Sequence, residues 1–167
     1  TSNQHPFFAD AFGNPASPYA DWYRWKDAAH RQYESFFGVL EMPTLNHDNA
    51  EAQRYLLDVA KYWLLKTGKG DARAGIDGLR ADYVLNVPHA FWKKLRAEVK
   101  ALRPDFLLLA EAWTRMLDIK PYYDDEFDAA FDFPVYGEIE GHADRVSDGL
   151  LVGALSPGSL DSALETQ

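Results

Sequence analysis

Residues 75–82 read GIDGLRAD and residues 107–113 read LLLAEAW, and these two stretches decide the fold. Each contains a short apolar run that ends in a carboxylate, at Asp82 and at Glu111. A helical pattern lies between them, so the sequence predicts two parallel strands joined by a helix, in either a (β/α)8 barrel or an open sheet. In both folds ligands bind at the carboxyl ends of the strands, where these two acids are expected.

The first strand, expected over residues 76–82, separates charged from apolar side chains. Successive side chains of a strand point to opposite faces, so Arg80 and Asp82 share one face with Gly78, while Leu79 and Ala81 share the other. We expect the apolar face to pack on helices. An arginine on the same face would keep the Asp82 carboxylate ionised and fix its position.

The second strand, expected over residues 106–111, gives its acid a different setting. Leu109 lies on the same face as Glu111, and Trp113 follows just beyond, so we expect an apolar environment that raises the pKa of Glu111. One charged and one protonated carboxylate form the working pair of retaining glycoside hydrolysis. The residues alone leave open that the two acids only cap helices or pair with arginine.

The other expected elements alternate in the same way. We expect helices over residues 48–66, capped by Asp48 or Asn49, and over residues 88–103, with Pro88 at its first position. A short helix is expected near residues 115–123, a third strand over 127–133, and further helices over 134–146 and 160–165. Residues 68–74 and 153–158 read as loops, and residues 1–47 as a loop-rich segment with an aromatic core.

Composition narrows the class of partner. The 167 residues are 47% hydrophobic, carry a net charge of −9 and include no cysteine. An acidic chain lacks the basic surface that binds nucleic acid or anionic membranes, and no apolar run is long enough to span a bilayer. A neutral ligand fits this balance better. Oligomeric state and compartment, cytoplasmic or secreted, stay open.

These motifs together resemble the alpha-amylase family of glycoside hydrolases, family 13. GLRAD at 78–82 is similar to the family's strand-four motif, LAEAW at 109–113 to strand five, and FDFP at 131–134 to strand six. HPFF at 5–8 and SPYADWY at 17–23 resemble the start of the inserted domain B, and MPTLN at 42–46 resembles its end. The motifs follow the family's order along nearly the whole chain.

The resemblance implies a partial (β/α)8 barrel, about strands four to six, in residues 48–167, preceded by domain B in residues 1–47. It also implies that the chain starts after the family's strand-three motif and stops before strand seven, which carries the third carboxylate. We therefore expect these 167 residues alone to have little activity and unpaired strand edges. The tripeptide NHD at 46–48 spells the motif of that third acid in the wrong place, and we assign Asp48 to helix capping.

The resemblance assigns the catalytic roles. It implies that Asp82 is the nucleophile, that Glu111 is the general acid and base, and that Arg80 positions Asp82, for retaining cleavage of α-glucosidic bonds in starch-like polysaccharides or malto-oligosaccharides. Trp113 and Tyr83 are expected to contact sugar. So is Asn86, although many relatives have histidine or glutamate there, which weakens an amylase-like subsite. No cofactor is expected, and calcium stays open because half of the family's site would lie outside the chain.

Two alternatives stay open. The chain could belong to a transglycosylase or isomerase of the same family, similar to a trehalose synthase or a cyclodextrin-forming enzyme. It could also belong to an amylase-like interaction subunit without activity. We expect Asp132 to be structural, and His89 and His142 to be exposed helix residues.

Overall fold

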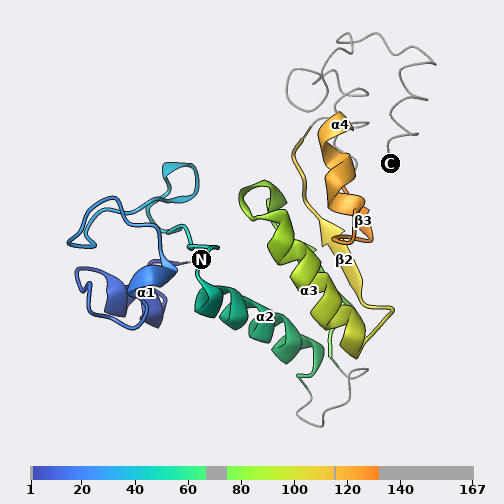
Figure 1. The fold of residues 1–167 in the computed structure, drawn as a ribbon, viewed down its shortest axis with the longest axis horizontal. Coiled ribbons are helices and arrows are strands. Elements are labelled where there is room, and N and C mark those ends of the chain that lie inside the picture. Colours follow the sequence, from blue (N-terminus) through green and yellow to red (C-terminus); the bar gives the residue numbers. More distant parts are fainter. Residues whose placement is uncertain (1, 67–74, 115, 132–167) are drawn as a thin grey trace. The chain divides into compact units, whose positions relative to one another are not determined.

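The computed structural model describes residues 2–66, 75–114 and 116–131 (Figure 1). The chain divides into two compact units, Thr1–Asp58 and Val59–Gln167. The domain boundary expected after residue 47 stays a prediction. The loops expected over 68–74 and 153–158, the helices over 134–146 and 160–165, Asp132 and His142 lie outside the described residues.

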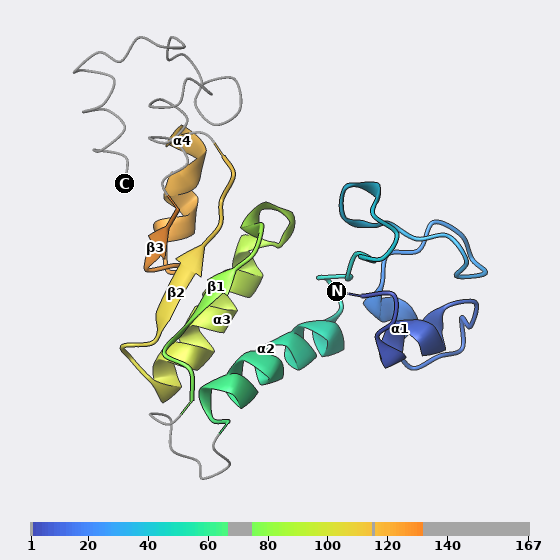
Figure 2. The same ribbon diagram turned by 180° about the vertical axis from the view of Figure 1, so that it is seen from behind.

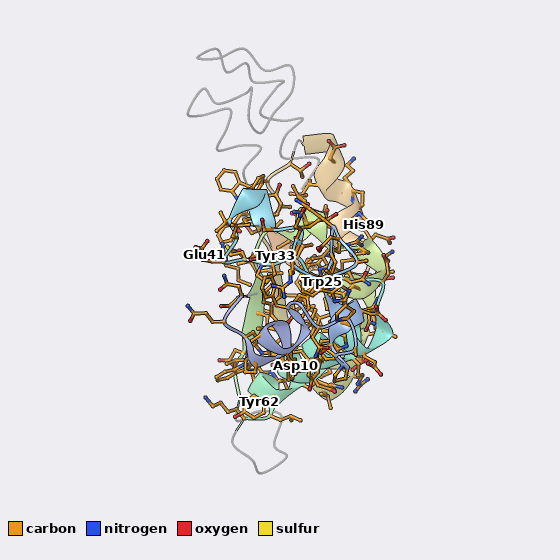
Figure 3. The ribbon with its side chains drawn as sticks, turned by 90° about the vertical axis from the view of Figure 1, so that its left-hand side faces the viewer. Asp10, Trp25, Tyr33, Glu41, Tyr62 and His89 are labelled. Atoms are coloured by element: carbon orange, nitrogen blue, oxygen red, sulfur yellow. The ribbon has the colours of Figure 1, made fainter. Side chains whose placement is uncertain are left out.

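The first unit is held together by aromatic side chains rather than by a sheet. Its regular elements are α1 (Pro6–Ala11) and two single turns, η1 (Ala20–Trp22) and η2 (Phe36–Gly38), and isolated bridges such as Trp25 with Tyr33 join its loops. Its core consists of Phe8, Ala11, Trp22, Tyr23 and Ala52, with Phe7, Tyr19, Trp25, Tyr33 and Leu45 packed against it. Figure 3 labels Trp25 and Tyr33, whose rings meet edge to face at 6.2 Å. The expected aromatic core is confirmed.

Helix α2 (Ala50–Leu64) confirms the expected helix, and Asn49, one of its two expected caps, caps it. The Asn49 side-chain oxygen accepts hydrogen bonds from the backbone N–H groups of Glu51 and Ala52, at 3.0 and 2.9 Å. Asp48 instead pairs with Arg24 at 3.1 Å, so the capping role given to Asp48 is wrong. Asn49 is one residue closer to the first turn, where an asparagine oxygen reaches the unpaired N–H groups directly.

Three short parallel strands form the centre of the second unit. They are β1 (Gly78–Ala81), β2 (Leu107–Ala110) and β3 (Ala129–Ala130), in that order across the sheet. In the register of β1 and β2, Arg80 faces Leu109. Gly78 is required there, since a Cβ atom would lie 2.5 Å from the carbonyl oxygen of Leu107. All three predicted strands are confirmed, each shorter than expected.

Helix α3 (His89–Leu102) links β1 to β2 and lies along one face of the sheet in both ribbon views (Figures 1 and 2). Pro88 occupies the N-cap position instead of the first helical position, so the helix begins one residue later than expected. The sheet residues Leu108 and Ala110 are buried, as are Leu95 and Val99 of α3. Leu79 and Ala81, which were expected to pack on helices, are half-buried, so the fully buried side chains of the sheet lie in β2.

Charged groups fasten α3 to the sheet. The Asp128 carboxylate accepts hydrogen bonds from Arg96 at 2.7 Å, from Lys100 at 2.9 Å and from the backbone N–H of Leu108 at 2.9 Å. Beyond β2, α4 (Met116–Ile119) and η4 (Lys120–Tyr123) form the expected short helical segment, and η3 (Val84–Asn86) follows β1. Among the described helices, none combines the length and apolar character that a membrane span needs.

Candidate active site

The carboxyl ends of β1 and β2 bring together the three residues to which the sequence analysis gave catalytic roles. Arg80 Nη1 lies 2.8 Å from Asp82 Oδ1, and Arg80 Nη2 lies 2.6 Å from Glu111 Oε1. The expected contact between Arg80 and Asp82 is therefore present. The second contact of Arg80, with Glu111 on the neighbouring strand, was not expected from the sequence. Alternation of side chains along one strand does not predict contacts with the next strand.

Glu111 is the less exposed of the two acids, with 15% of its side chain exposed against 66% for Asp82. It continues β2 past the last ladder residue, since its backbone N–H donates to the carbonyl of Ala81 at 3.0 Å. The strand geometry thus places both carboxylates on one guanidinium.

The residue after Asp82 contributes its backbone to this cluster. Tyr83 has a left-handed conformation, with φ of 44° and ψ of 66°, and its N–H donates to Glu111 Oε2 at 3.1 Å. The next N–H, from Val84, donates to the backbone carbonyl of Glu111 at 3.1 Å. A left-handed tyrosine is uncommon, and such strain persists only where its surroundings hold it.

The pKa of Glu111 is lowered, so the expectation that it would be raised is wrong. Desolvation does act upward on this pKa, as predicted, but hydrogen bonds from the side chain of Trp113, from the backbone of Tyr83, and with Asp82 and Arg80 act downward and outweigh it. Desolvation lowers the pKa of Arg80, but its contacts with Glu111 and Asp82 outweigh this and raise it. The site as it stands favours an ionised Glu111.

The expected sugar-binding residues have different positions. Trp113 is 49% exposed, and its side chain hydrogen-bonds to Glu111. Tyr83 is half-buried beside the same carboxylate. Asn86 lies exposed in η3, and the described hydrogen bonds of Arg80 and the two acids do not involve it.

Sequence reasoning missed two features near this cluster. The ring of Phe131 lies 5.7 Å from the Arg80 guanidinium carbon, in a cation–π contact that the FDFP motif at 131–134 could have suggested. His89 is an exposed helix residue, as expected, but its contact with Glu126, whose side chain is fully buried, was not expected; the two side chains lie 2.8 Å apart. The run of acids at 124–126 gave no sign that one of them would be buried.

The described residues offer no metal centre. Within 2–66, 75–114 and 116–131, no three histidine, aspartate or glutamate side chains gather as a group that could hold a metal ion.

Comparison with known proteins places this arrangement in context. The family described as "Alpha amylase, catalytic domain" matches residues 1–145. A cyclomaltodextrinase from Geobacillus thermopakistaniensis is 37% identical over 135 residues, covering 77% of this chain and 21% of the relative. A maltogenic alpha-amylase from Bacillus acidopullulyticus is 34% identical over 125 residues, covering 71% and 20%.

A solved structure shows the same fold. The cyclic alpha-maltosyl-(1→6)-maltose hydrolase from Arthrobacter globiformis superposes with a TM-score of 0.74 and 27% identity, covering 98% of this chain and 35% of that one. The chain spans about a fifth of the length of the curated relatives it matches. The parallel sheet and its helices are therefore part of a (β/α)8 barrel, as predicted.

Proposed function

The chain belongs to the alpha-amylase family as part of its catalytic domain, and from that premise we propose that it supplies the nucleophile and the acid/base of a retaining α-glucan hydrolase. Asp82 is the nucleophile, Glu111 is the acid/base and Arg80 holds both. The proposed substrates are malto-oligosaccharides and related α-glucans. The names of the relatives, cyclomaltodextrinase and maltogenic alpha-amylase, support this class of substrate.

The proposed reaction has two displacements. Asp82 attacks the anomeric carbon while the glycosidic C–O bond breaks and the proton of Glu111 passes to the leaving oxygen. A water molecule then attacks the same carbon, giving a proton to Glu111 as the bond to Asp82 breaks. The sugar leaves with its original configuration, and both acids return to their starting states.

The contact of Arg80 with both carboxylates is the observation that carries the proposal. Retaining enzymes place their two carboxyl groups about 5 Å apart, whereas inverting enzymes leave about 6.5–9.5 Å for a water molecule. Hydrogen bonds of 2.8 and 2.6 Å to one guanidinium, together with the hydrogen bond between the side chains of Glu111 and Asp82, support the shorter separation. The proposal thus rests on geometry as well as on the family.

The lowered pKa of Glu111 fits its second role and sets a condition on its first. An ionised Glu111 is the base that accepts a proton from water, but the first step needs the protonated form. Desolvation is the upward influence on this pKa, and a bound glucan would strengthen it by excluding water. We propose that substrate binding promotes protonation of Glu111.

Activity assays on the full-length protein test this function. We expect release of reducing sugar from maltotriose or a cyclomaltodextrin, and its loss in both Asp82→Asn and Glu111→Gln. Asp105→Asn, the same change at an exposed position before β2, is the matched control and should retain activity. A wild-type protein that cleaves no glucan would favour the interaction subunit. Unchanged turnover in Asp82→Asn would contradict Asp82 as the nucleophile, and products formed mainly with an added acceptor sugar would favour a transglycosylase.

A further inference from the structure

A buried carboxylate outside the candidate site is hydrogen-bonded to the first residue of α3. Glu126 lies between η4 and β3, and none of its side chain is exposed. The His89 Nδ1 atom lies 2.8 and 2.9 Å from its two oxygens. The His89 ring, which Figure 3 labels, also packs on Tyr122, with ring centroids 4.6 Å apart. A fully buried acid needs such a partner, because an isolated charge is costly to bury.

The other charged neighbours of Glu126 do not replace His89. Lys93 lies one turn further along α3 and bonds to Asp124 at 2.6 Å, near the surface. Electrostatically, Lys93 favours the ionised form of Glu126, while Asp124 opposes it. Burial, and then Coulombic interactions with Glu126 and Tyr83, raise the pKa of Tyr122. His89 is therefore the direct hydrogen-bond partner of Glu126.

A chain of contacts connects this pair to the acid/base. The ring of Trp92, in the first turn of α3, packs against Phe127, the residue after Glu126, at 5.1 Å. The Trp92 indole N–H donates to the carbonyl of Val84 at 3.3 Å. Val84 is completely buried, and its own N–H bonds to the backbone of Glu111. The start of α3 thus fixes the turn that follows Asp82.

The conformation of Tyr83 gives this chain a purpose. Its left-handed backbone directs an N–H at Glu111 Oε2, at 3.1 Å. A tyrosine in this region is strained, so it stays there only while its neighbours are fixed. If the start of α3 were released from the segment before β3, the turn could relax and withdraw this N–H.

We propose that His89 and Glu126 are positioning residues that hold the strained Tyr83 turn, and through it the acid/base Glu111. This inference rests on the proposed function for its kinetic consequence, but its structural part does not depend on activity. Neither residue touches the substrate in this account. They act by joining α3 to the segment before β3.

The test compares Glu126→Gln and His89→Gln with wild type in the full-length protein. Loss of the Tyr83 N–H would remove a bond that favours the Glu111 carboxylate, so its pKa would rise. The basic limb of the kcat/KM profile reports this acid, and we expect it to move upward by about one pH unit. Hydrogen exchange at Tyr83 and Val84 should quicken about tenfold, while the amides of β2 stay protected.

Asp124→Asn is the matched control, because it breaks an exposed ion pair between the same two segments. It should leave both the basic limb and the exchange unchanged. Since Glu126→Gln alters a buried group, His89→Gln at a half-exposed position provides a second route to the same result. Folded variants with wild-type exchange at Tyr83, or with slower turnover but an unmoved basic limb, would overturn the proposal. If wild type cleaves no glucan, the proposed function fails, while the exchange measurement still decides this inference.

Discussion

Glu111 at the end of β2 and Glu126 before β3 are both shielded from solvent, but their pKa values shift in opposite directions. The pKa of Glu111 is lowered, because hydrogen bonds from Trp113, the Tyr83 backbone and Arg80 outweigh its desolvation. The pKa of Glu126 is raised, because desolvation outweighs its bond to His89. The number and charge of the donors decide the direction of the shift. A permanently charged guanidinium and a backbone N–H help to offset the desolvation of Glu111, whereas one imidazole does not offset the desolvation of Glu126.

The comparison also separates two tasks. The end of β2 has to keep a carboxylate ready for proton transfer, and Arg80 there serves two acids at once. The segment before β3 has to stay closed against α3, and a buried pair with few alternatives suits that task.

The largest effect is expected from Arg80→Met in the full-length protein. This change removes the cation from both carboxylates while keeping the length of the side chain. We expect kcat/KM to fall by about 10²–10³-fold, as when one electrostatic donor is lost from an active site. Arg80→Lys should recover only part of the loss, since one ammonium cannot span both acids. Kinetics with a folding check by circular dichroism test this, and wild-type activity in Arg80→Met would refute the shared role of Arg80.

A smaller effect, on stability, is expected from His89→Leu. Glu126 would stay buried without its hydrogen-bond partner, and we expect the free energy of unfolding to fall by about 1–3 kcal/mol. The control is Arg54→Gln, which breaks an exposed pair with Asp58 and should cost less than about 0.5 kcal/mol. Urea unfolding measures both. Equal stability of the two variants would show that the Glu126 pair does not hold this part of the fold.

The smallest effect is a pair of opposite pH dependences. A raised pKa means that folded Glu126 binds its proton more tightly than the unfolded chain, so its contribution to stability is lost as pH rises above about 4.3. A lowered pKa means that the contribution of Glu111 is lost as pH falls below the same value.

Unfolding midpoints from about pH 2 to about pH 7 measure these dependences. Relative to Glu126→Gln, wild type should lose stability as pH rises. Relative to Glu111→Gln, it should gain. Slopes of the same sign would contradict the difference between the two glutamates.

Much of the fold could be predicted from the sequence, because local patterns decide it. Alternation along residues 106–111 separated buried Leu108 and Ala110 from Glu111, and the breaks at Pro88 and Pro104 bounded α3 closely. The cap of α2 was assigned partly to the wrong residue, since Asp48 and Asn49 are both good caps and only the entry angle of the chain selects one.

The electrostatics of the site could not be predicted in the same way. The pKa of Glu111 depends on an arginine from a neighbouring strand and on the left-handed backbone of Tyr83, and neither contact follows from residue spacing. The burial of Glu126 was hidden for a related reason. It stands beside Asp124 and Asp125, and only the packing of α3 distinguishes it from those exposed acids.

Trapping the covalent intermediate identifies the nucleophile. Incubating the full-length protein with a slowly released fluoroglucosyl fluoride, followed by peptide mass spectrometry, should find one sugar attached to Asp82. The product released on longer incubation should have retained configuration. A sugar attached to another residue, or a product with inverted configuration, would contradict the assignment of Asp82 and Glu111.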